Sequence, residues 1–341
     1  MVKNASSLFI QALRCQNPSR PPVWFMRQAG RYMASYRALR KKYDFLEMCH
    51  QPELIAEVTK LPVHAFGVDA AILFSDILVI PEAMGRGLHF KEGTGPIIER
   101  PILTPQDVKD LPGPEDLQTL HYVQEGIHLL KQDLSVPLIG FCGAPFTVAS
   151  YMIEGGSSRD LKKTKRWMLT YPEAFWELLK KIADWSIAYL NMQIAAGVEA
   201  LQIFDSWANA LAHVQFCDYA LASLRYILKG VKSTSIPIIL FCRNSSIFAP
   251  QLVNLQPSAI SLDWNCDITQ MRKFIPYPIA MQGNLDPDLL YAPKNQLKAE
   301  VQRILEGMRG DSGFIFNLGH GIAPDVPEEA IQTVVDCVKN Y

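Results

Sequence analysis

The sequence of 341 residues predicts an α/β fold, a (β/α)8 barrel of the TIM type. Short apolar runs recur about eight times along the chain and amphipathic stretches separate them, which is the alternation that builds such a barrel. A doubly wound sheet is the alternative, but no glycine-rich dinucleotide turn follows the first apolar run.

The apolar runs are rich in β-branched and aromatic residues and have the length of buried parallel strands. They cover residues 22–25, 70–74, 136–141, 200–204, 236–241, 259–262, 279–281 and 314–316.

Helical patterns occupy much of the sequence between these runs. The longest begins with Pro172 and carries Glu173 in its first turn, as helix N-termini prefer. The patterns cover residues 53–66, 115–134, 172–196, 211–229, 294–308 and 327–340.

The segment 85–101 departs from this alternation. Alternating residues at 88–91 and 97–99 flank Gly93-Thr94-Gly95, which predicts a hairpin inserted after the second strand. No linker, low-complexity segment or residue-level repeat divides the chain. We therefore expect residues 1–341 to form a single barrel domain.

The composition excludes several classes of protein. The 33 Lys and Arg side chains nearly balance the 34 Asp and Glu side chains, so we expect no nucleic-acid partner. No apolar run is long enough to span a bilayer and the first residues do not resemble a secretory signal, so we expect no membrane partner. The seven cysteines are scattered and form no C-x-x-C pair, which is typical of reduced thiols in a cytoplasmic protein.

The most informative stretch is residues 25–33, FMRQAGRYM. It places Arg27 and Arg31 just after an apolar run, and Arg37 and Arg40 follow. Guanidinium groups stay charged and bind carboxylates or phosphates at two points. The cluster predicts a ligand that carries several negative charges.

Polar residues and glycines follow each predicted strand, at the edge of a barrel where active sites lie. In chain order they are Arg27 and Arg31; Ser75 and Asp76; 143–146 with Tyr151; Asp205, Ser206 and Trp207; Arg243; Asp263; Gln282, Gly283 and Asn284; and Gly319, His320 and Gly321.

Structural alternatives exist for most of these residues. They are a solvated helix face for Arg27 and Arg31, a basic surface run for Arg40, helix caps for Asp76 and Ser206, and a core aromatic for Tyr151. His320 stands between two glycines, an unusual place for a core histidine, whereas Asp263 beside Trp264 is expected to be structural.

Several well-known motifs are absent. The sequence has no G-x-x-x-x-G-K-[ST] phosphate loop, no G-x-G-x-x-G turn, no H-E-x-x-H pair and no G-x-S-x-G elbow. We therefore expect a reaction without a nucleotide, a metal, an acyl-enzyme or any other cofactor.

These blocks together closely resemble the uroporphyrinogen decarboxylase family, nearly from end to end. They are WFMRQAGRY at 24–32, FSDIL at 74–78, GAPFT at 143–147, YMIEGG at 151–156, FDSWA at 204–208, QGNLDP at 282–287 and NLGHGI at 317–322.

The resemblance implies a TIM-type barrel that forms a homodimer with facing clefts. It implies removal of the four acetate carboxyls of uroporphyrinogen III to give coproporphyrinogen III, in haem and tetrapyrrole biosynthesis. The implied cleft residues are Arg27, Arg31, Arg40, Asp76, Tyr151, Ser206 and His320, of which Asp76, Arg27, Tyr151 and His320 are expected to act in catalysis.

Two stretches depart from the family pattern. Asn209 stands where the family usually has glycine, and Arg243-Asn244-Ser245-Ser246 stands where the family usually has lysine followed by glycines. Both departures leave the shape of a cleft loop open.

Two other functions compete with this one. Cobalamin- or folate-linked methyltransferases share the barrel, but they need zinc held by a His-x-Cys pair, and no histidine lies two residues before Cys242. A non-catalytic tetrapyrrole-binding protein is the other alternative, although the chain keeps Asp76 and the arginines.

Overall fold

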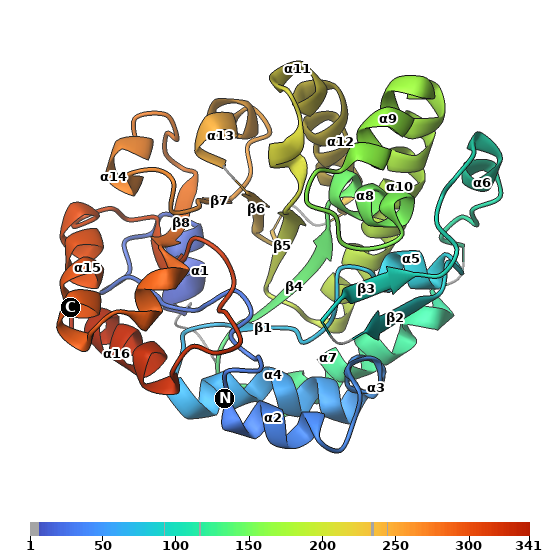
Figure 1. Ribbon diagram of the computed structural model, residues 1–341. Helices are drawn as coiled ribbons and strands as arrows, with labels where there is room; N and C mark the ends of the chain where they lie inside the picture. Colours follow the sequence, from blue (N-terminus) through green and yellow to red (C-terminus); the bar gives the residue numbers. More distant parts are fainter. Residues whose placement is uncertain (1–6, 92, 116, 233–234, 244) are drawn as a thin grey trace.

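The computed structural model describes residues 7–91, 93–115, 117–232, 235–243 and 245–341. Seven parallel strands curl into one sheet in the order β1-β4-β5-β6-β7-β8-β9, and helices cover its outside (Figure 1). The strands are β1 Ala71–Ile72, β4 Leu138–Gly143, β5 Ala200–Asp205, β6 Ile238–Cys242, β7 Ala259–Ser261, β8 Ala280–Leu285 and β9 Phe314–Leu318.

Among the described residues, the first four α-helices precede β1 in the chain, and the others lie between or after the strands. They are α1 Leu8–Leu13, α2 Ala34–Arg40, α3 Phe45–His50, α4 Pro52–Phe66, α5 Val79–Ala83, α6 Pro105–Lys109, α7 His121–Asp133, α8 Pro145–Glu154, α9 Lys162–Thr170, α10 Pro172–Ala196, α11 His213–Gln215, α12 Ala222–Gly230, α13 Ser245–Val253, α14 Ile268–Met271, α15 Lys294–Gly307 and α16 Glu328–Lys339. Short 3-10 turns are η1 Gln118–Leu120, η2 Ala208–Ala210 and η4 Pro287–Tyr291, and η3 Phe216–Leu221 is a π-helical turn.

The predicted first strand is reduced to a single bridge, in which Val23 pairs with Phe316 of β9. Pro22 has no N–H group and can only accept a hydrogen bond, which it does from the Phe316 N–H at 2.9 Å. On its other side, the Val23 carbonyl accepts from the Asp69 N–H at 2.8 Å, just before β1. This segment therefore joins β9 to the β1 side of the sheet, so the predicted barrel is confirmed with a shortened first strand.

Two predicted helices differ from the structure. The helix predicted over 115–134 begins only at His121, because a 3-10 turn precedes it. The helix predicted over 211–229 is interrupted by the π-helical turn η3. Around that turn Phe216 stacks on Phe248 at 3.8 Å and Tyr219 meets Phe175 at 5.1 Å, so both aromatic rings find partners.

A separate antiparallel pair lies between β1 and β4 in the chain. Strands β2 Leu88–Lys91 and β3 Gly95–Ile98 pair from Leu88 opposite Ile98 to Lys91 opposite Gly95. A further bridge joins Ile97 to Gly156, just after α8, so this pair lies beside the carboxyl end of β4 (Figure 1).

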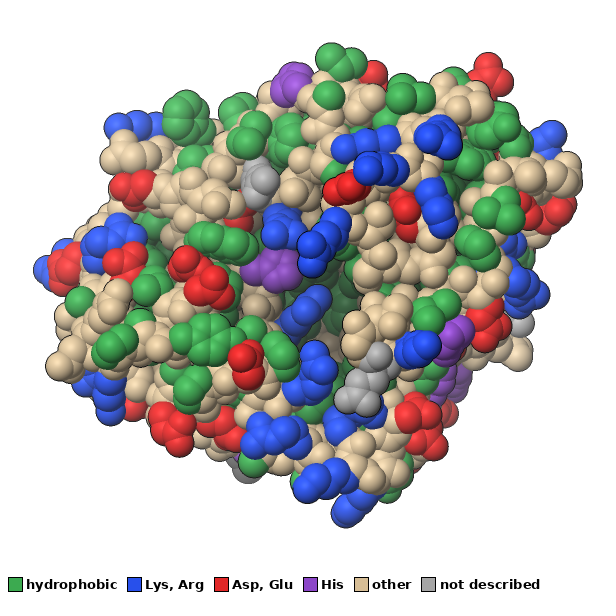
Figure 2. Space-filling view, in the orientation of Figure 1, with side chains coloured by type: hydrophobic (Ala, Val, Ile, Leu, Met, Phe, Trp, Pro, Cys, Tyr) green, Lys and Arg blue, Asp and Glu red, His purple; other side chains and the backbone are tan. Residues whose placement is uncertain are grey.

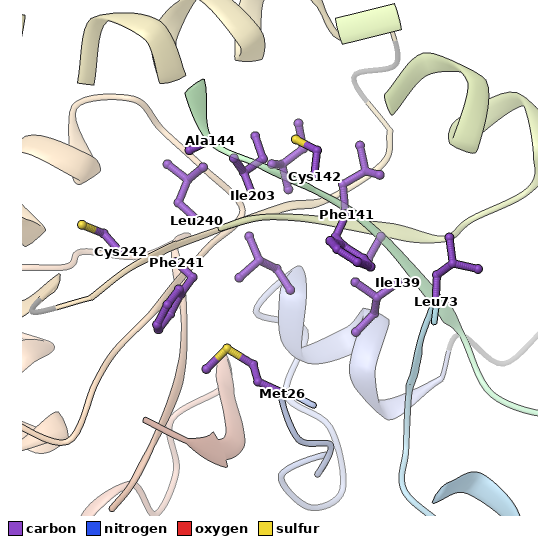
Figure 3. Packing of buried hydrophobic residues seen from close by; sticks show 14 of the residues in the cluster. Met26, Leu73, Ile139, Phe141, Cys142, Ala144, Ile203, Leu240, Phe241 and Cys242 are labelled. Carbon is purple, nitrogen blue, oxygen red and sulfur yellow. The ribbon is translucent and has the colours of Figure 1, made fainter. Parts of the chain in front are cut away.

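Side chains alternate across the strands between the barrel interior and the helical layer. Figure 3 shows Met26 and Phe241 on one side of the strands and Ile203 and Leu240 on the other. Inside the barrel, Gln282 accepts from Trp24 Nε1 at 2.9 Å and donates to Ser261 Oγ at 3.0 Å. This polar layer is buried, so the barrel is filled below the edge where the strands end.

In the part of the chain that the structure describes, no helix has both the length and the apolar character needed to cross a membrane.

Candidate active site

The loop that carries Arg27 is held from several directions. Arg27 adopts a left-handed backbone conformation with φ 59°. The side chain of Gln28 accepts from the Phe25 N–H at 3.1 Å and donates to the Ala70 carbonyl at 3.1 Å. These bonds fix a turn, not a helix, so Arg27 and Arg31 do not lie on a solvated helix face.

The Arg27 loop is also tied to the loop after β9. The Met26 N–H donates to Asn317 Oδ1 at 3.2 Å, and the Ile322 N–H donates to the Met26 carbonyl at 3.1 Å. Because both loops share these bonds, Arg27 and His320 keep a fixed relation at the mouth of the barrel.

Asp76 follows β1 and has one oxygen engaged. The Leu78 N–H donates to Asp76 Oδ1 at 2.8 Å within a short turn. The Asp76 side chain does not cap helix α5, whose N-cap residue is Leu78, so the helix-cap alternative is wrong. Burial raises the pKa of the Asp76 carboxyl, while the Leu78 amide and the Arg27 guanidinium act in the opposite direction. Asp76 and Arg27 therefore interact electrostatically, and the bond from Leu78 leaves Asp76 Oδ2 for another partner.

Tyr151 lies on α8 and is half-buried. Burial raises the pKa of its hydroxyl, Asp76 raises that pKa further and Arg27 lowers it, so Tyr151 lies near both groups. Its ring meets the ring of Trp207 at 6.1 Å. Ser206 precedes Trp207 in the turn after β5 and is also half-buried.

His320 lies against two aromatic rings, at 5.8 Å from Phe241 and 6.4 Å from Trp264. Burial lowers the pKa of His320 to about 4, and the positive charges of Arg27 and Arg243 act in the same direction. His320 is therefore neutral near pH 7, with one ring nitrogen that donates and one that accepts.

Arg31 and Arg40 stand further along the same arginine cluster. Both lower the pKa of Tyr36, which burial raises to about 12. Arg31 is exposed, whereas Arg40 ends α2 and donates to the Tyr43 carbonyl at 2.7 Å. Arg37 differs from both, because its guanidinium donates to the backbone carbonyls of Arg31 and Tyr32 and so supports the turn.

The guanidinium groups of this region form no ion pair with a carboxylate of the described residues. Among the residues that the structure describes, the arginines in ion pairs are Arg20, Arg272, Arg303 and Arg309. Within the same ranges, no ion pair is formed by Arg27, Arg31, Arg40 or Arg243. Figure 2 shows a hollow on this face of the molecule with Lys or Arg side chains and a histidine around it. Unpaired positive charge around a hollow favours an anionic ligand.

An aromatic row forms part of the wall and was not predicted as part of the site. Phe141, Phe204 and Phe241 lie on β4, β5 and β6, with ring centroids 5.6 and 5.9 Å apart. Each points inward by the alternation of its strand. The inward and outward alternation of side chains near the end of each predicted strand was the signal in the sequence that would have identified these three phenylalanines. The row gives the barrel an apolar, largely buried aromatic surface near its mouth.

The two departures from the family pattern have different outcomes. Asn209 lies in η2 and its Oδ1 is buried, with no hydrogen-bond partner among the described residues. Arg243 is half-buried after β6, and Asn244 lies outside the described residues.

Asp263 is buried and its Oδ1 accepts from the Asn265 N–H at 2.9 Å, as expected of a structural residue. Within the described ranges, no group of three or more His, Cys, Asp or Glu side chains could hold a metal ion.

Comparison with known proteins places the whole chain. The family model described as uroporphyrinogen decarboxylase (URO-D) matches residues 4–341. Uroporphyrinogen decarboxylase of Protochlamydia amoebophila is 64% identical over 97% of this chain and 90% of its own. The enzyme of that name from Carboxydothermus hydrogenoformans is 45% identical over 97% of this chain and 95% of its own.

Solved structures show the same fold at lower identity. A methyltransferase from Methanosarcina mazei superposes with a TM-score of 0.83 at 22% identity, covering 98% of this chain and 99% of its own. A B12-independent methionine synthase from Shewanella superposes with a TM-score of 0.53 at 12% identity, covering 84% and 85%. At these identities the likeness concerns the fold alone.

Proposed function

Because the chain belongs to the uroporphyrinogen decarboxylase family, we propose that it is a carboxy-lyase that removes the four acetate carboxyls of uroporphyrinogen III and forms coproporphyrinogen III. The observation that carries this proposal is the group of guanidiniums that form no ion pair with a described residue, beside one half-buried carboxylate, Asp76, at the mouth of the barrel. Such a mouth suits a ligand with many carboxylates around a ring of N–H donors.

The reaction needs an electron sink, and the pyrrole ring supplies it. Protonation of a ring carbon beside the acetate-bearing position gives a cationic, imine-like ring. The bond to the carboxylate then breaks, carbon dioxide leaves, and the electron pair forms an exocyclic methylene. Protonation of the methylene gives the methyl group, and loss of the proton from the ring carbon restores the pyrrole. Each cycle therefore consumes one proton and releases one carbon dioxide.

Asp76 is proposed to stabilise the cationic ring. An ionised carboxylate only accepts hydrogen bonds, and Asp76 Oδ2 is the oxygen that the bond from the Leu78 N–H leaves for the pyrrole N–H groups. Burial disfavours the bare charge of Asp76, and a cationic ring beside it would relieve that cost. The interaction is stronger with the protonated ring than with the neutral one, as catalysis requires.

The arginines are proposed to bind the carboxylates of the substrate. Arg27 is the most central of them, because its positive charge lowers the pKa of Asp76, of Tyr151 and of His320. Arg31 and Arg40 would hold acetate or propionate groups further out. Arg27 is also proposed to take part in proton delivery, an unusual role for a guanidinium group.

Tyr151, Ser206 and His320 are proposed to orient substrate carboxylates or a water that relays protons. The low pKa of His320 means that its ring is neutral near pH 7 and can both donate and accept a hydrogen bond. It therefore adds no positive charge to those of Arg27 and Arg243. No observation favours the zinc-dependent methyltransferase alternative.

We propose a homodimer with facing clefts, which the family resemblance implies. We also propose a cytoplasmic location, which the scattered cysteines favour, without a nucleic-acid or membrane partner, as the near balance of charges and the short apolar runs indicate.

The test is a product assay with the full chain and uroporphyrinogen III under anaerobic conditions. We expect products with seven, six, five and finally four carboxyl groups, together with stoichiometric carbon dioxide. Recovery of unchanged uroporphyrinogen, with the protein folded and the substrate reduced, would reject the proposal.

A further inference from the structure

Trp207, which stands beside the candidate site residue Ser206, is held by α8 at two points. Its backbone N–H donates to Thr147 Oγ1 at 3.0 Å, and its ring meets the ring of Tyr151 at 6.1 Å and 64°. Thr147 and Tyr151 are four residues apart on α8, so their side chains project from the same face of the helix. The helix therefore holds both the backbone and the ring of Trp207.

Asp205 orients the Thr147 hydroxyl. The hydroxyl donates to Asp205 Oδ1 at 2.6 Å, and both side chains are almost completely buried. A threonine hydroxyl has a single proton, so donation to Asp205 leaves a lone pair directed at the Trp207 N–H. The hydrogen bonds thus run from Trp207 through Thr147 to Asp205, the last residue of β5.

Thr147 differs from three other hydroxyls, which lie on helices α8, α10 and α16. Ser150 donates to the Phe146 carbonyl at 2.8 Å, Ser186 to Ile182 at 2.9 Å and Thr333 to Glu329 at 2.7 Å, each within its own helix. That bond to the preceding turn is the usual choice of a helical serine or threonine. Thr147 instead joins α8 to the end of β5 and to the turn after it.

A carboxyl group at position 205 is energetically unfavourable, because it is buried and only partly hydrogen-bonded. Its Oδ2 is buried and has no hydrogen-bond partner among the described residues. Burial raises the pKa of the carboxyl to about 7, and its other neighbour across the strands is the buried thiol of Cys242. A buried polar atom without a partner calls for an explanation beyond packing. The hydrogen-bonded series through Thr147 provides one.

We propose that Thr147 and Asp205 are positioning residues for the decarboxylation, because they hold the Ser206–Trp207 turn against Tyr151. The inference rests on the proposed function. Neither residue touches the substrate in this account. They set where Ser206 and the Tyr151 hydroxyl stand in the cleft, and displacement of such groups by about 1 Å costs up to about 100-fold in rate.

The test compares three variants of α8 in the full chain. Thr147→Val keeps the shape and removes the hydroxyl, Thr147→Ser keeps the hydroxyl, and Ser150→Ala removes a buried hydroxyl whose bond stays within the helix. We expect Thr147→Val to lower kcat about tenfold or more with little change in KM, Thr147→Ser to restore most of the activity, and Ser150→Ala to match the wild type.

Equal kinetics of Thr147→Val and the wild type would overturn the inference, as would an equal loss in Ser150→Ala. If Thr147→Val does not fold, Asp205→Ala replaces it, since it removes only the acceptor, and unchanged kcat in that variant would overturn the inference too. Absence of activity in the wild type itself would instead reject the proposed function, so the two failures are distinguishable.

Discussion

The side-chain stem of Arg27 lies directly against Gly321. A Cβ atom on Gly321 would stand 2.5 Å from Cδ and 2.7 Å from Cγ of Arg27. The two loops cannot easily separate, because the Ile322 N–H donates to the Met26 carbonyl. Glycine is needed at position 321 because Arg27 occupies the space that a side chain would take.

Gly321→Ala should therefore displace the guanidinium of Arg27. We expect kcat/KM to fall about tenfold or more, because Arg27 acts on three other site residues. Steady-state kinetics measure the loss, and the midpoint of urea unfolding serves as the control for folding. Wild-type kinetics in a folded Gly321→Ala variant would show that the position of Arg27 is not critical.

Asp76→Asn removes the negative charge of residue 76 and leaves the size of its side chain almost unchanged. The amide oxygen can still accept from the Leu78 N–H, so the turn should be kept. Loss of the negative charge beside the cationic ring should lower kcat on the order of 100-fold, as for other preorganised electrostatic groups. Single-turnover rates and the circular dichroism of the variant would be measured together. Near-normal turnover would remove Asp76 from the mechanism.

The strands were predictable because a parallel sheet buried on both faces leaves uninterrupted apolar runs in the sequence. The helix Pro172–Ala196 was predicted to the residue, since Pro172 begins it and Gly197, with φ 113°, follows its last turn. The bridge at Val23 was harder to foresee. The extent of pairing at this position depends on the register with β9 and on the bond from the Val23 N–H to Asp69, and both partners are distant in sequence.

The candidate site residues were chosen from their place after each predicted strand, whereas their mutual arrangement could not be predicted. Burial, not residue type, makes His320 neutral and raises the pKa of Asp76. The contact between Thr147 and Asp205 was not predicted, because Asp205 points away from the barrel interior, toward α8. Such contacts depend on packing between elements that are far apart in sequence.

Arg243 should contribute to substrate binding. It lies two residues beyond Phe241, lowers the pKa of His320, and has no ion pair among the described residues. Arg243→Ala should raise KM for uroporphyrinogen about tenfold, the value of one charge-assisted hydrogen bond, and Arg243→Lys should recover part of the loss. Arg225→Ala, at an exposed arginine of α12, is the matched control. A KM for Arg243→Ala that equals the control would contradict this role.

Asp69 should be important for closing the barrel. Its carboxylate accepts from both terminal nitrogens of Arg20 at 2.8 Å and from the Val23 N–H at 2.8 Å. Asp69→Ala leaves a largely buried guanidinium and a backbone N–H without an acceptor, which should lower the free energy of unfolding by about 2–4 kcal/mol. Urea denaturation measures the change. Asp160→Ala, at an exposed ion pair with Lys162, should change it by less than about 0.5 kcal/mol. Equal effects of the two variants would count against the role of Asp69.

The half-buried His320 and the buried Asp205 should make opposite contributions to the pH dependence of stability. The pKa of His320 falls from its ordinary 6.5 to about 4 on folding, so between these values only the unfolded chain holds that proton and rising pH stabilises the fold. The pKa of Asp205 rises from 3.8 to about 7, so in that range the folded chain holds the extra proton and rising pH destabilises the fold. Arg27 and Arg243 act on His320, while the Thr147 hydroxyl and the Cys242 thiol face Asp205. From about pH 4 to 6.5 the two contributions oppose each other.

Comparison of Asp205→Asn with the wild type should isolate the contribution of Asp205 to the pH dependence of stability. The amide does not titrate, so the free energy of unfolding of the variant, relative to the wild type, should rise by about 1.4 kcal/mol per pH unit between pH 4 and 7. His320→Asn should give a relative change of the opposite sign between pH 4 and 6.5. Urea denaturation of the wild type and both variants at half-unit steps of pH measures these differences, and groups common to all three cancel. A flat difference for Asp205→Asn over this range would mean that Asp205 titrates normally, and a falling one would mean that its pKa lies below that of an exposed carboxyl.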